Sequence, residues 1–156
     1  MRIMLLGVGA VGEAYAVLAQ KGDPNGEWLE QLVLADFNLN RAREVQAKLG
    51  DPVRFPAERV DVTQKEQIVA LARKYNVNLI MNACAQVFNV PIFEGTYEAG
   101  CNYMDMAMTL SEMNVEDPYN KVGVMLGDYQ FARHQAWKEK GLLALVAMGV
   151  DPGMSQ

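Results

Sequence analysis

Three glycines near the start of the chain, Gly7, Gly9 and Gly12, have the spacing of a phosphate-binding turn. They follow the apolar run of residues 2–6, and the helix-favouring segment of residues 13–20 begins directly after them. Gly7 permits a tight turn out of a strand, Gly9 lets the backbone approach a phosphate, and Gly12 lets the helix lie close to the strand. Because the first amides of a helix attract anions, this arrangement predicts a site for a dinucleotide pyrophosphate.

Acidic residues stand where two further predicted strands end. Asp36 closes the apolar run of residues 31–35, and Asp61 follows the third predicted strand, residues 53–60. A carboxylate after the second strand accepts hydrogen bonds from the adenosine ribose and repels a 2′-phosphate, which favours NAD. Asp61 and the amide of Val62 are expected to contact the adenine edge. Helix capping by Asp36 and a turn role for Asp61 are the alternatives.

Two arginines bear on the choice between NAD and NADP. Arg41 and Arg43 lie close enough to Asp36 in the sequence to hold the 2′-phosphate of NADP. Exposed arginines are common, so we expect both to lie on the solvated face of the helix predicted for residues 39–49. The sequence therefore predicts NAD or NADP as the cofactor, with Asp36 favouring NAD.

Small and acidic residues close the fourth and fifth predicted strands. Ala83 and Cys84 end the strand of residues 78–83, where small side chains leave room for a cofactor. Cys84 could lie near the nicotinamide, and a buried, inert thiol is the alternative that we favour. Asp105, in the apolar strand of residues 102–106, must be paired or functional. It is our candidate catalytic residue, orienting a substrate amine or the cofactor, unless it caps the following turn.

These positions belong to one site if the strands are parallel, because ligands then bind across the carboxyl ends of the strands. Cys84 and Cys101 lack CxxC spacing, and His134 has polar neighbours and is expected on the surface, so we predict no metal site. The predicted cofactor-binding residues are Gly7, Gly9, Ala10, Val11, Gly12, Asp36, Asp61, Val62, Ala83 and Cys84.

Strands and helices alternate along the chain, and the strands are continuously apolar. This pattern is typical of a parallel sheet covered by helices on both faces. It predicts an α/β, doubly wound Rossmann domain over residues 1–156 with strand order 3-2-1-4-5-6. The long segment of residues 107–127 has no clear period and is expected to be a functional or mobile loop. The remaining predicted elements are a strand at 142–148 and helices at 64–75, capped by Thr63, at 90–100 and at 129–140.

The composition is that of an ordinary globular domain. The chain has 156 residues, of which 51% are hydrophobic and 21% charged, and its net charge is −5. This charge, without a basic cluster, argues against nucleic acid and anionic membranes as partners. The sequence has no signal peptide, no apolar run long enough to span a membrane, and two cysteines, so we expect a cytoplasmic protein with reduced thiols.

The closing sequence GVDPGMS, residues 149–155, predicts the start of a helix. Asp151 suits the N-cap and Pro152 the first helical position. Such a helix terminus could bind a substrate carboxylate over the cofactor. We therefore expect this chain to be the cofactor half of a larger enzyme, whose C-terminal catalytic and dimerisation domain is absent.

The sequence resembles the N-terminal NAD(P)-binding domain of the saccharopine dehydrogenase family. The resemblance rests on the glycines of residues 7–12, LAD at 34–36, VDV at 60–62, NYMD at 102–105 and GVDPG at 149–153. It implies hydride transfer between a nicotinamide and an amine or imine carbon of an amino-acid substrate. It also implies a C-terminal domain with most substrate contacts and often the interface of a homodimer. The segment of residues 107–127 departs from the shorter connection of this family, and we expect it to overhang the cleft.

Two other functions deserve comparison with this prediction. A non-catalytic NAD(P)-sensing module would share the glycine turn and the acid after the second strand, but it would not need a helix beginning with Asp-Pro-Gly. A short-chain-type reductase needs a Tyr-x-x-x-Lys pair, and no tyrosine here has a lysine four residues later. We therefore predict an NAD(P)-dependent oxidoreductase that acts on a C–N bond of an amino-acid-derived substrate, with the sensing module as the alternative.

Overall fold

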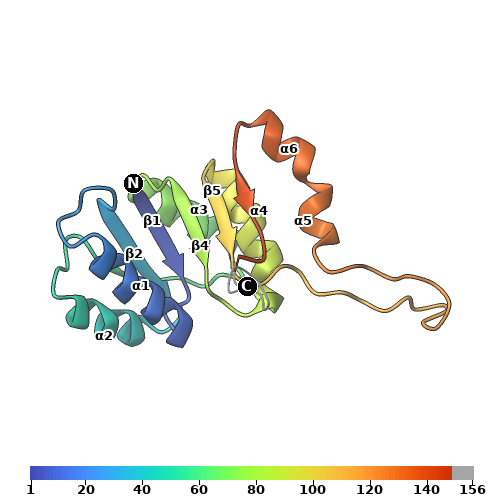
Figure 1. The fold of residues 1–156 in the computed structure, drawn as a ribbon, viewed down its shortest axis with the longest axis horizontal. Helices are drawn as coiled ribbons and strands as arrows, with labels where there is room; N and C mark the ends of the chain where they lie inside the picture. The colour runs from blue at the N-terminus through green and yellow to red at the C-terminus, as the bar shows by residue number, and fades with distance from the viewer. Residues whose placement is uncertain (149–156) are drawn as a thin grey trace.

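A parallel six-stranded sheet forms the centre of the computed structural model, which describes residues 1–148 (Figure 1). Its strand order, β3-β2-β1-β4-β5-β6, is the predicted one. Every neighbouring pair of strands runs parallel, so all the carboxyl ends lie along the same edge of the sheet. The strands are β1 (Arg2–Leu6), β2 (Gln31–Asp36), β3 (Ala57–Arg59), β4 (Leu79–Asn82), β5 (Asn102–Asp105) and β6 (Ala144–Leu145).

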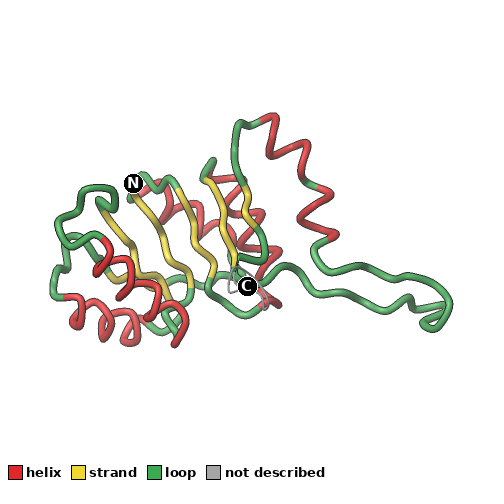
Figure 2. Tube along the Cα trace, viewed as in Figure 1, coloured by secondary structure: helices red, strands yellow, loops and turns green. Residues whose placement is uncertain are grey.

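Helices cover both faces of the sheet, as predicted (Figures 1 and 2). α1 (Ala10–Gly22) and α2 (Leu39–Leu49) pack on one face, together with buried side chains such as Leu5 and Leu34. α3 (Lys65–Lys74) and α4 (Asn89–Ala99) pack on the other face. The shorter helices are η1 (Gln86–Phe88), α5 (Asp128–Ala132) and α6 (His134–Glu139).

The burial of β1 on both faces explains its continuous apolar sequence. Successive side chains of a strand point to opposite faces of its sheet. Ile3 and Leu5 accordingly pack with α1 and α2, whereas Met4 and Leu6 pack with α3 and α4. These four side chains are at most 1% exposed, and each contributes about 1.5–3 kcal/mol of hydrophobic stabilisation. β1 is therefore fixed at the middle of the domain.

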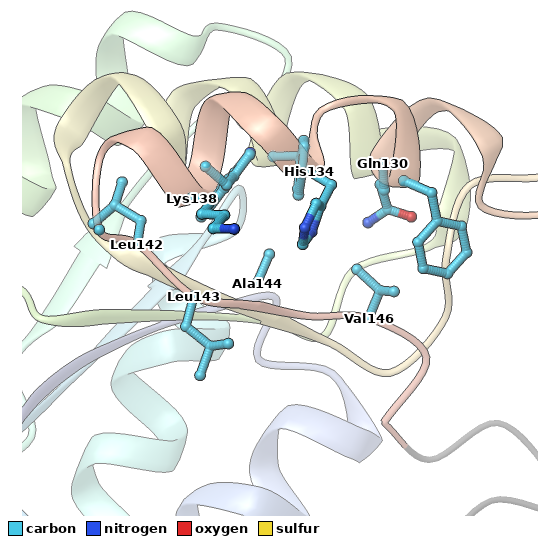
Figure 3. Close-up of a pocket in the computed structure, with 11 residues that line it drawn as sticks. Gln130, His134, Lys138, Leu142, Leu143, Ala144 and Val146 are labelled. Carbon is cyan, nitrogen blue, oxygen red and sulfur yellow. The ribbon is translucent and has the colours of Figure 1, made fainter.

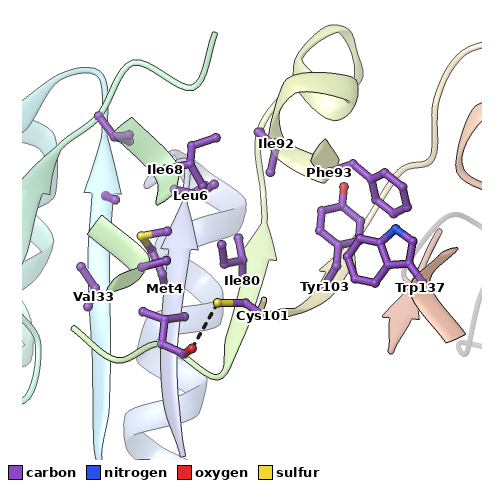
Figure 4. Packing of buried hydrophobic residues seen from close by; sticks show 14 residues of the cluster. Met4, Leu6, Val33, Ile68, Ile80, Ile92, Phe93, Cys101, Tyr103 and Trp137 are labelled. Atoms are coloured by element: carbon purple, nitrogen blue, oxygen red, sulfur yellow. Dashed lines mark hydrogen bonds between the residues drawn. The ribbon is translucent and has the colours of Figure 1, made fainter. Parts of the chain in front are cut away.

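An aromatic cluster joins α6 to the sheet (Figure 4). Phe93 of α4 lies with its ring centroid 5.0 Å from that of Tyr103 on β5 and 4.7 Å from that of Trp137 on α6. Nearby, the thiol of Cys101 donates a hydrogen bond to the carbonyl oxygen of Val77 at 3.1 Å. Cys101 therefore has a structural position in the core.

The outer strands β3 and β6 are shorter than predicted. A proline without an amide hydrogen precedes β3, and the chain changes direction after β6. Pro56 accepts a hydrogen bond from the Leu34 amide at 2.8 Å, but proline has no amide to donate, and β3 begins one residue later. After β6, Ala147 has a φ of 60°, which turns the chain out of the extended conformation.

Two predicted helix features are wrong. The helix predicted for residues 129–140 divides at Arg133, whose ψ is 0° and whose guanidinium pairs with Glu94 at 3.1 Å. Thr63 does not cap α3, which begins after Gln64. The amide and hydroxyl of Thr63 instead donate to the Asp61 carboxylate at 3.0 Å and 2.7 Å, closing a turn ahead of the helix.

The segment of residues 107–127 forms a long arm (Figures 1 and 2). An antiparallel bridge between Glu112 and Val124 holds its two sides together, and the Asn114 side chain accepts two amide hydrogen bonds at its tip. In Figure 1 the arm projects away from the sheet, so the expectation that it overhangs the cleft is wrong. Val115 and Tyr119 are 97% and 95% exposed, because nothing in residues 1–148 packs on them.

Among residues 1–148, no helix has both the length and the apolar character that crossing a membrane would require. Residues 149–156, including the closing motif for which a helix start is predicted, lie outside the described residues.

Limited chymotrypsin digestion should cut the arm first, after Tyr119, because this side chain is 95% exposed. Mass spectrometry of early time points should find the fragments 1–119 and 120–156. Tyr103, which is fully buried, is the internal control. Cleavage after Tyr103 before cleavage after Tyr119 would contradict the described packing.

Candidate functional site

The three glycines of the turn after β1 have different surroundings. Gly7 has a φ of 86°, and a Cβ there would lie 2.9 Å from the Cys84 sulfur. A Cβ on Gly12 would overlap the carbonyl oxygen of Gly7, so α1 can approach the turn only because Gly12 has no side chain. A Cβ on Gly9 would meet no atom of the described residues within 4 Å. Gly7 and Gly12 thus serve the fold, whereas Gly9 faces space that a ligand can occupy.

The amino terminus of α1 points its amides at this space. The first hydrogen bond of the helix joins the Glu13 amide to the Gly9 carbonyl at 2.9 Å, and no side chain caps the terminus. The amides of Ala10, Val11 and Gly12 therefore lack partners within the helix, as first-turn amides do. Gly9, Ala10 and Val11 are exposed. The arrangement can bind an anion by backbone donors alone.

Two cations neutralise the acid in the first turn of α1. The carboxylate of Glu13 accepts a hydrogen bond from Lys48 at 2.6 Å and another from Arg41. Hydrogen bonds from Lys48 and Arg41 hold the pKa of Glu13 below its usual range. Without these partners, Glu13 would repel an anion at the helix terminus.

Arg41 also braces the turn itself, since its Nε donates to the carbonyl oxygen of Val8 at 2.9 Å. Its side chain is half-buried, and the expectation of a solvated side chain is wrong for Arg41 because the contacts to Val8 and Glu13 connect distant segments. Arg43 is exposed, as expected.

The carboxylate of Asp36 connects the turns after β1 and β2. It accepts hydrogen bonds from the amides of Val8 at 2.7 Å and Asn38 at 2.8 Å. The N-cap of α2 is Asn38, whose side chain accepts from the Asn40 amide at 3.1 Å, so the alternative of Asp36 as the N-cap is wrong. Asp36 is half-exposed, and its oxygens retain lone pairs for a ribose hydroxyl.

A hollow of about 420 Å³ lies beside the glycine turn. This volume is in the range of small-molecule sites, and most of the lining is apolar. It brings together several predicted residues, while Gly9, Ala10 and Val11 lie at the adjoining helix terminus and Ala83 packs against Gly7. The hollow is lined by Gly7, Asp36, Phe37, Val60, Asp61, Val62, Thr63, Cys84 and Phe88.

Asp61 takes the turn role that the sequence left open, through its hydrogen bonds to Thr63. These hydrogen bonds, with a smaller contribution from the positive charge of Arg59, lower the pKa of Asp61. Asp61 therefore remains ionised near neutral pH while it also lines the hollow.

Burial raises the pKa of the Cys84 thiol to about 12, and the negative charge of Asp36 adds to the effect. The thiol is therefore protonated at neutral pH and unsuited to nucleophilic attack. The geometry gives Cys84 a packing position in the wall of the hollow, next to Gly7.

Asp105 is completely buried, and its carboxylate has partners on three elements. One oxygen accepts from the Tyr103 hydroxyl at 2.9 Å and the Gln130 side chain at 2.6 Å. The other oxygen accepts from the amide of Ala147 at 2.6 Å. These contacts tie β5 to α5 and to the bend after β6. They favour a positioning role over direct contact with a substrate, and the catalytic role of Asp105 stays a prediction.

The Asp105 contacts continue into a buried network of amide side chains. Asn82, at the end of β4, donates to the Tyr103 hydroxyl at 3.1 Å and to Asn89 at 2.8 Å. Asn89 in turn donates to the carbonyl oxygen of Ala107 at the base of the arm. Sequence reasoning missed Asn89 and Gln130, because a single polar residue in a helix gives no signal of burial.

A second hollow, of about 470 Å³, lies between α5, α6 and β6 (Figure 3). His134 and Lys138 point from α6 towards the strand that carries Ala144, and most other lining residues are apolar. His134 is exposed, as expected. Within the part of the chain that the structure describes, no cluster of three or more His, Cys, Asp or Glu side chains could hold a metal ion.

Comparison with known sequences identifies relatives of this arrangement. Residues 3–145 match the family described as saccharopine dehydrogenase NADP binding domain. The carboxyaminopropylagmatine dehydrogenase of Synechocystis sp. is 26% identical over 154 residues, which are 99% of this chain and 35% of that protein. The carboxynorspermidine synthase of Vibrio cholerae is 24% identical over 165 residues, covering 99% of this chain and 37% of that protein. The chain thus spans about a third of the length of these curated relatives.

Solved structures share the fold at low sequence identity. Apo saccharopine dehydrogenase (L-Glu forming) from Saccharomyces cerevisiae has a TM-score of 0.67 and 12% identity, covering 99% of this chain and 28% of that chain. An NAD binding oxidoreductase from Klebsiella pneumoniae has a TM-score of 0.65 and 18% identity, covering 95% of this chain and 34% of that chain.

The surroundings of the glycines predict a large and a small loss of stability for two alanine substitutions. Gly12→Ala should lower the free energy of unfolding by about 3 kcal/mol or more, because the new methyl group overlaps the Gly7 carbonyl. Gly9→Ala should cost less than about 1 kcal/mol, the usual effect of alanine at an N-cap. Urea unfolding followed by circular dichroism measures both. Equal losses in the two variants would contradict the described approach of α1 to the turn.

The raised pKa values predict slow thiol chemistry. Burial raises the pKa of Cys84 to about 12 and that of Cys101 to about 11. Only the thiolate reacts, so at pH 8 iodoacetamide should label both cysteines at least about 100-fold more slowly than in the urea-unfolded chain. The rate for Cys84 should keep rising with pH beyond 9, as mass spectrometry can follow. Rapid labelling of the folded chain at pH 7 would show that the thiols are accessible and ionised.

Proposed function

Because the chain belongs to the saccharopine dehydrogenase NADP-binding domain family, we propose that it holds the cofactor of an NAD(P)-dependent oxidoreductase acting on the C–N bond of an amino-acid-derived substrate. The observation that carries this proposal is the open space at Gly9, which faces the uncapped terminus of α1 and adjoins the hollow that contains Asp36. The pyrophosphate of a dinucleotide would bind at the terminus of α1, and its adenosine would occupy the hollow.

The pyrophosphate would be held by the backbone. The amides of Ala10, Val11 and Gly12, together with the positive end of the α1 dipole, suit an anion that approaches over Gly9. Glu13 does not oppose this, because Arg41 and Lys48 neutralise it.

The adenosine would occupy the hollow beside the turn. Asp36 would accept a hydrogen bond from a ribose hydroxyl without losing its contacts to Val8 and Asn38, since each carboxylate oxygen can accept more than one bond. Asp61 and Val62 would lie against the adenine, as expected from the sequence. The charge of Asp36 favours NAD, whereas the family is named for NADP binding.

The nicotinamide would lie towards the ends of β4 and β5, where Ala83 and Cys84 offer small side chains beside the glycine turn. The bound cofactor would supply hydride transfer. We propose that Asp105 acts on this region by positioning: it holds the bend at Ala147 and, through Gln130 and Tyr103, the elements on either side.

The substrate site would involve more chain than the described residues. The curated relatives are about three times as long as the part that this chain covers, and two of them are named as a dehydrogenase and a synthase. We propose that a further domain supplies most substrate contacts and that residues 1–156 form the cofactor domain of a cytoplasmic enzyme that can form a homodimer. The alternative of a non-catalytic sensing module gains no support from the names of these relatives.

A cofactor titration tests the proposal. The chain should bind NADH or NADPH, detected as a change in nicotinamide fluorescence, and Gly9→Ala should weaken binding at least about 10-fold by filling the space for the phosphates. Asp36→Ala should weaken NADH more than NADPH, because only NADH offers a 2′-hydroxyl to the carboxylate. Folding of each variant is checked by circular dichroism. If the folded chain binds neither nucleotide at millimolar concentration, the proposal is wrong.

A further inference from the structure

Arg59 stands next to Asp36 at the carboxyl edge of the sheet. It is the last residue of β3 and the register partner of Asp36 on β2. Ala57 packs with the α1–α2 side of the core and Val60 with the α3–α4 side, so the alternation of the strand places Arg59 on the side of α2. Its guanidinium lies 5.1 Å from the centroid of the Phe37 ring, and its side chain is exposed.

A third hollow separates Arg59 from the start of α2. It has a volume of about 450 Å³ and adjoins the proposed adenosine hollow, because Phe37 lines both. Because Arg59 is the register partner of Asp36, this hollow lies next to the carboxylate at which the ribose is proposed to bind. The hollow is lined by Phe37, Asn38, Leu39, Asn40 and Arg59.

The two arginines that the sequence suggested for a 2′-phosphate are placed differently. Arg41 donates hydrogen bonds to Val8, Glu13 and Glu44, and binding a phosphate elsewhere would break its contact with the glycine turn. Arg43 is exposed and lines neither hollow. Arg59 forms no ion pair within residues 1–148, and its Nε donates one long hydrogen bond, 3.4 Å, to the Phe37 carbonyl. Its outer nitrogens are therefore available to a phosphate.

We propose that Arg59 binds the adenosine 2′-phosphate of NADP(H) and sets the affinity of the site for this cofactor relative to NAD(H). The inference rests on the proposed dinucleotide function and adds a residue that decides between the two nucleotides. A guanidinium presents paired N–H donors that match phosphate oxygens. Asp36 and Arg59 then act on the same ribose carbon in opposite senses: the carboxylate favours a hydroxyl and the guanidinium favours a phosphate. The site accepts both nucleotides, and Arg59 offsets the repulsion of the 2′-phosphate by Asp36.

The test compares Arg59→Gln with the matched surface variant Arg43→Gln in titrations with NADPH and NADH. Arg59→Gln should weaken NADPH about 10- to 100-fold, the usual value of charge-assisted hydrogen bonds, and change NADH less than about twofold. Arg59→Lys keeps the charge but loses the paired donors, so its NADPH affinity should lie between those of the wild type and Arg59→Gln. Arg43→Gln should leave both affinities unchanged. Because both arginines are exposed, these variants should fold, which thermal unfolding checks.

Nucleotide fragments isolate the phosphate contact. The wild-type chain should bind adenosine 2′,5′-bisphosphate more tightly than adenosine 5′-monophosphate, and Arg59→Gln should abolish the difference. Equal weakening of NADPH and NADH by Arg59→Gln, an unchanged NADPH affinity, or a wild type that binds NADH but not NADPH would each overturn the proposal while leaving dinucleotide binding intact. A wild type that binds neither nucleotide would instead refute the proposed function on which this inference rests.

Discussion

The approach of α1 to the backbone of the turn after β1 is the constraint on which the candidate site depends. It requires a residue without a side chain at position 12, because any Cβ there would occupy the place of the Gly7 carbonyl oxygen. Once α1 is seated, Asp36 can reach the Val8 amide and Arg41 can reach the Val8 carbonyl. This one close contact thus helps to position the free amides of α1, the Asp36 carboxylate and the Arg41 side chain.

Much of this arrangement could be predicted because it is encoded locally. The bounds of α2 match the prediction, since Gly50 gives a clear stopping signal with its left-handed φ of 77°, although the sequence offered Asp36 as the cap where the structure has Asn38. The strand order could be predicted because continuously apolar strands indicate a parallel sheet, and a parallel sheet that starts with this glycine turn is typical of the doubly wound fold. The conformation of the glycine turn follows for the same reason, because the spacing of Gly7, Gly9 and Gly12 is local, and the cofactor roles of these residues and of Asp36 stay predictions.

The side-chain partnerships across elements could not be predicted. The sequence predicts a solvated side chain for Arg41, whereas its contacts to Val8 and Glu13 join residues 33 and 28 positions apart. The partners of Asp105 come from α5 and from the bend after β6, and Arg59 meets Asp36 only through the register of β2 and β3. A periodicity specifies which face a residue occupies, but the register, the crossing of helices and the direction of a long loop arise only when the whole chain packs.

The bonds of Asp36 to the Val8 and Asn38 amides have a kinetic consequence. They fix the two turns that flank the proposed adenosine hollow in the absence of a nucleotide, so complex formation needs no slow ordering of either turn. Association in a stopped-flow instrument would then follow a single exponential whose rate rises linearly with nucleotide concentration, without the plateau that a preceding isomerisation imposes. Differences in affinity between nucleotides would accordingly reside in how fast each one leaves.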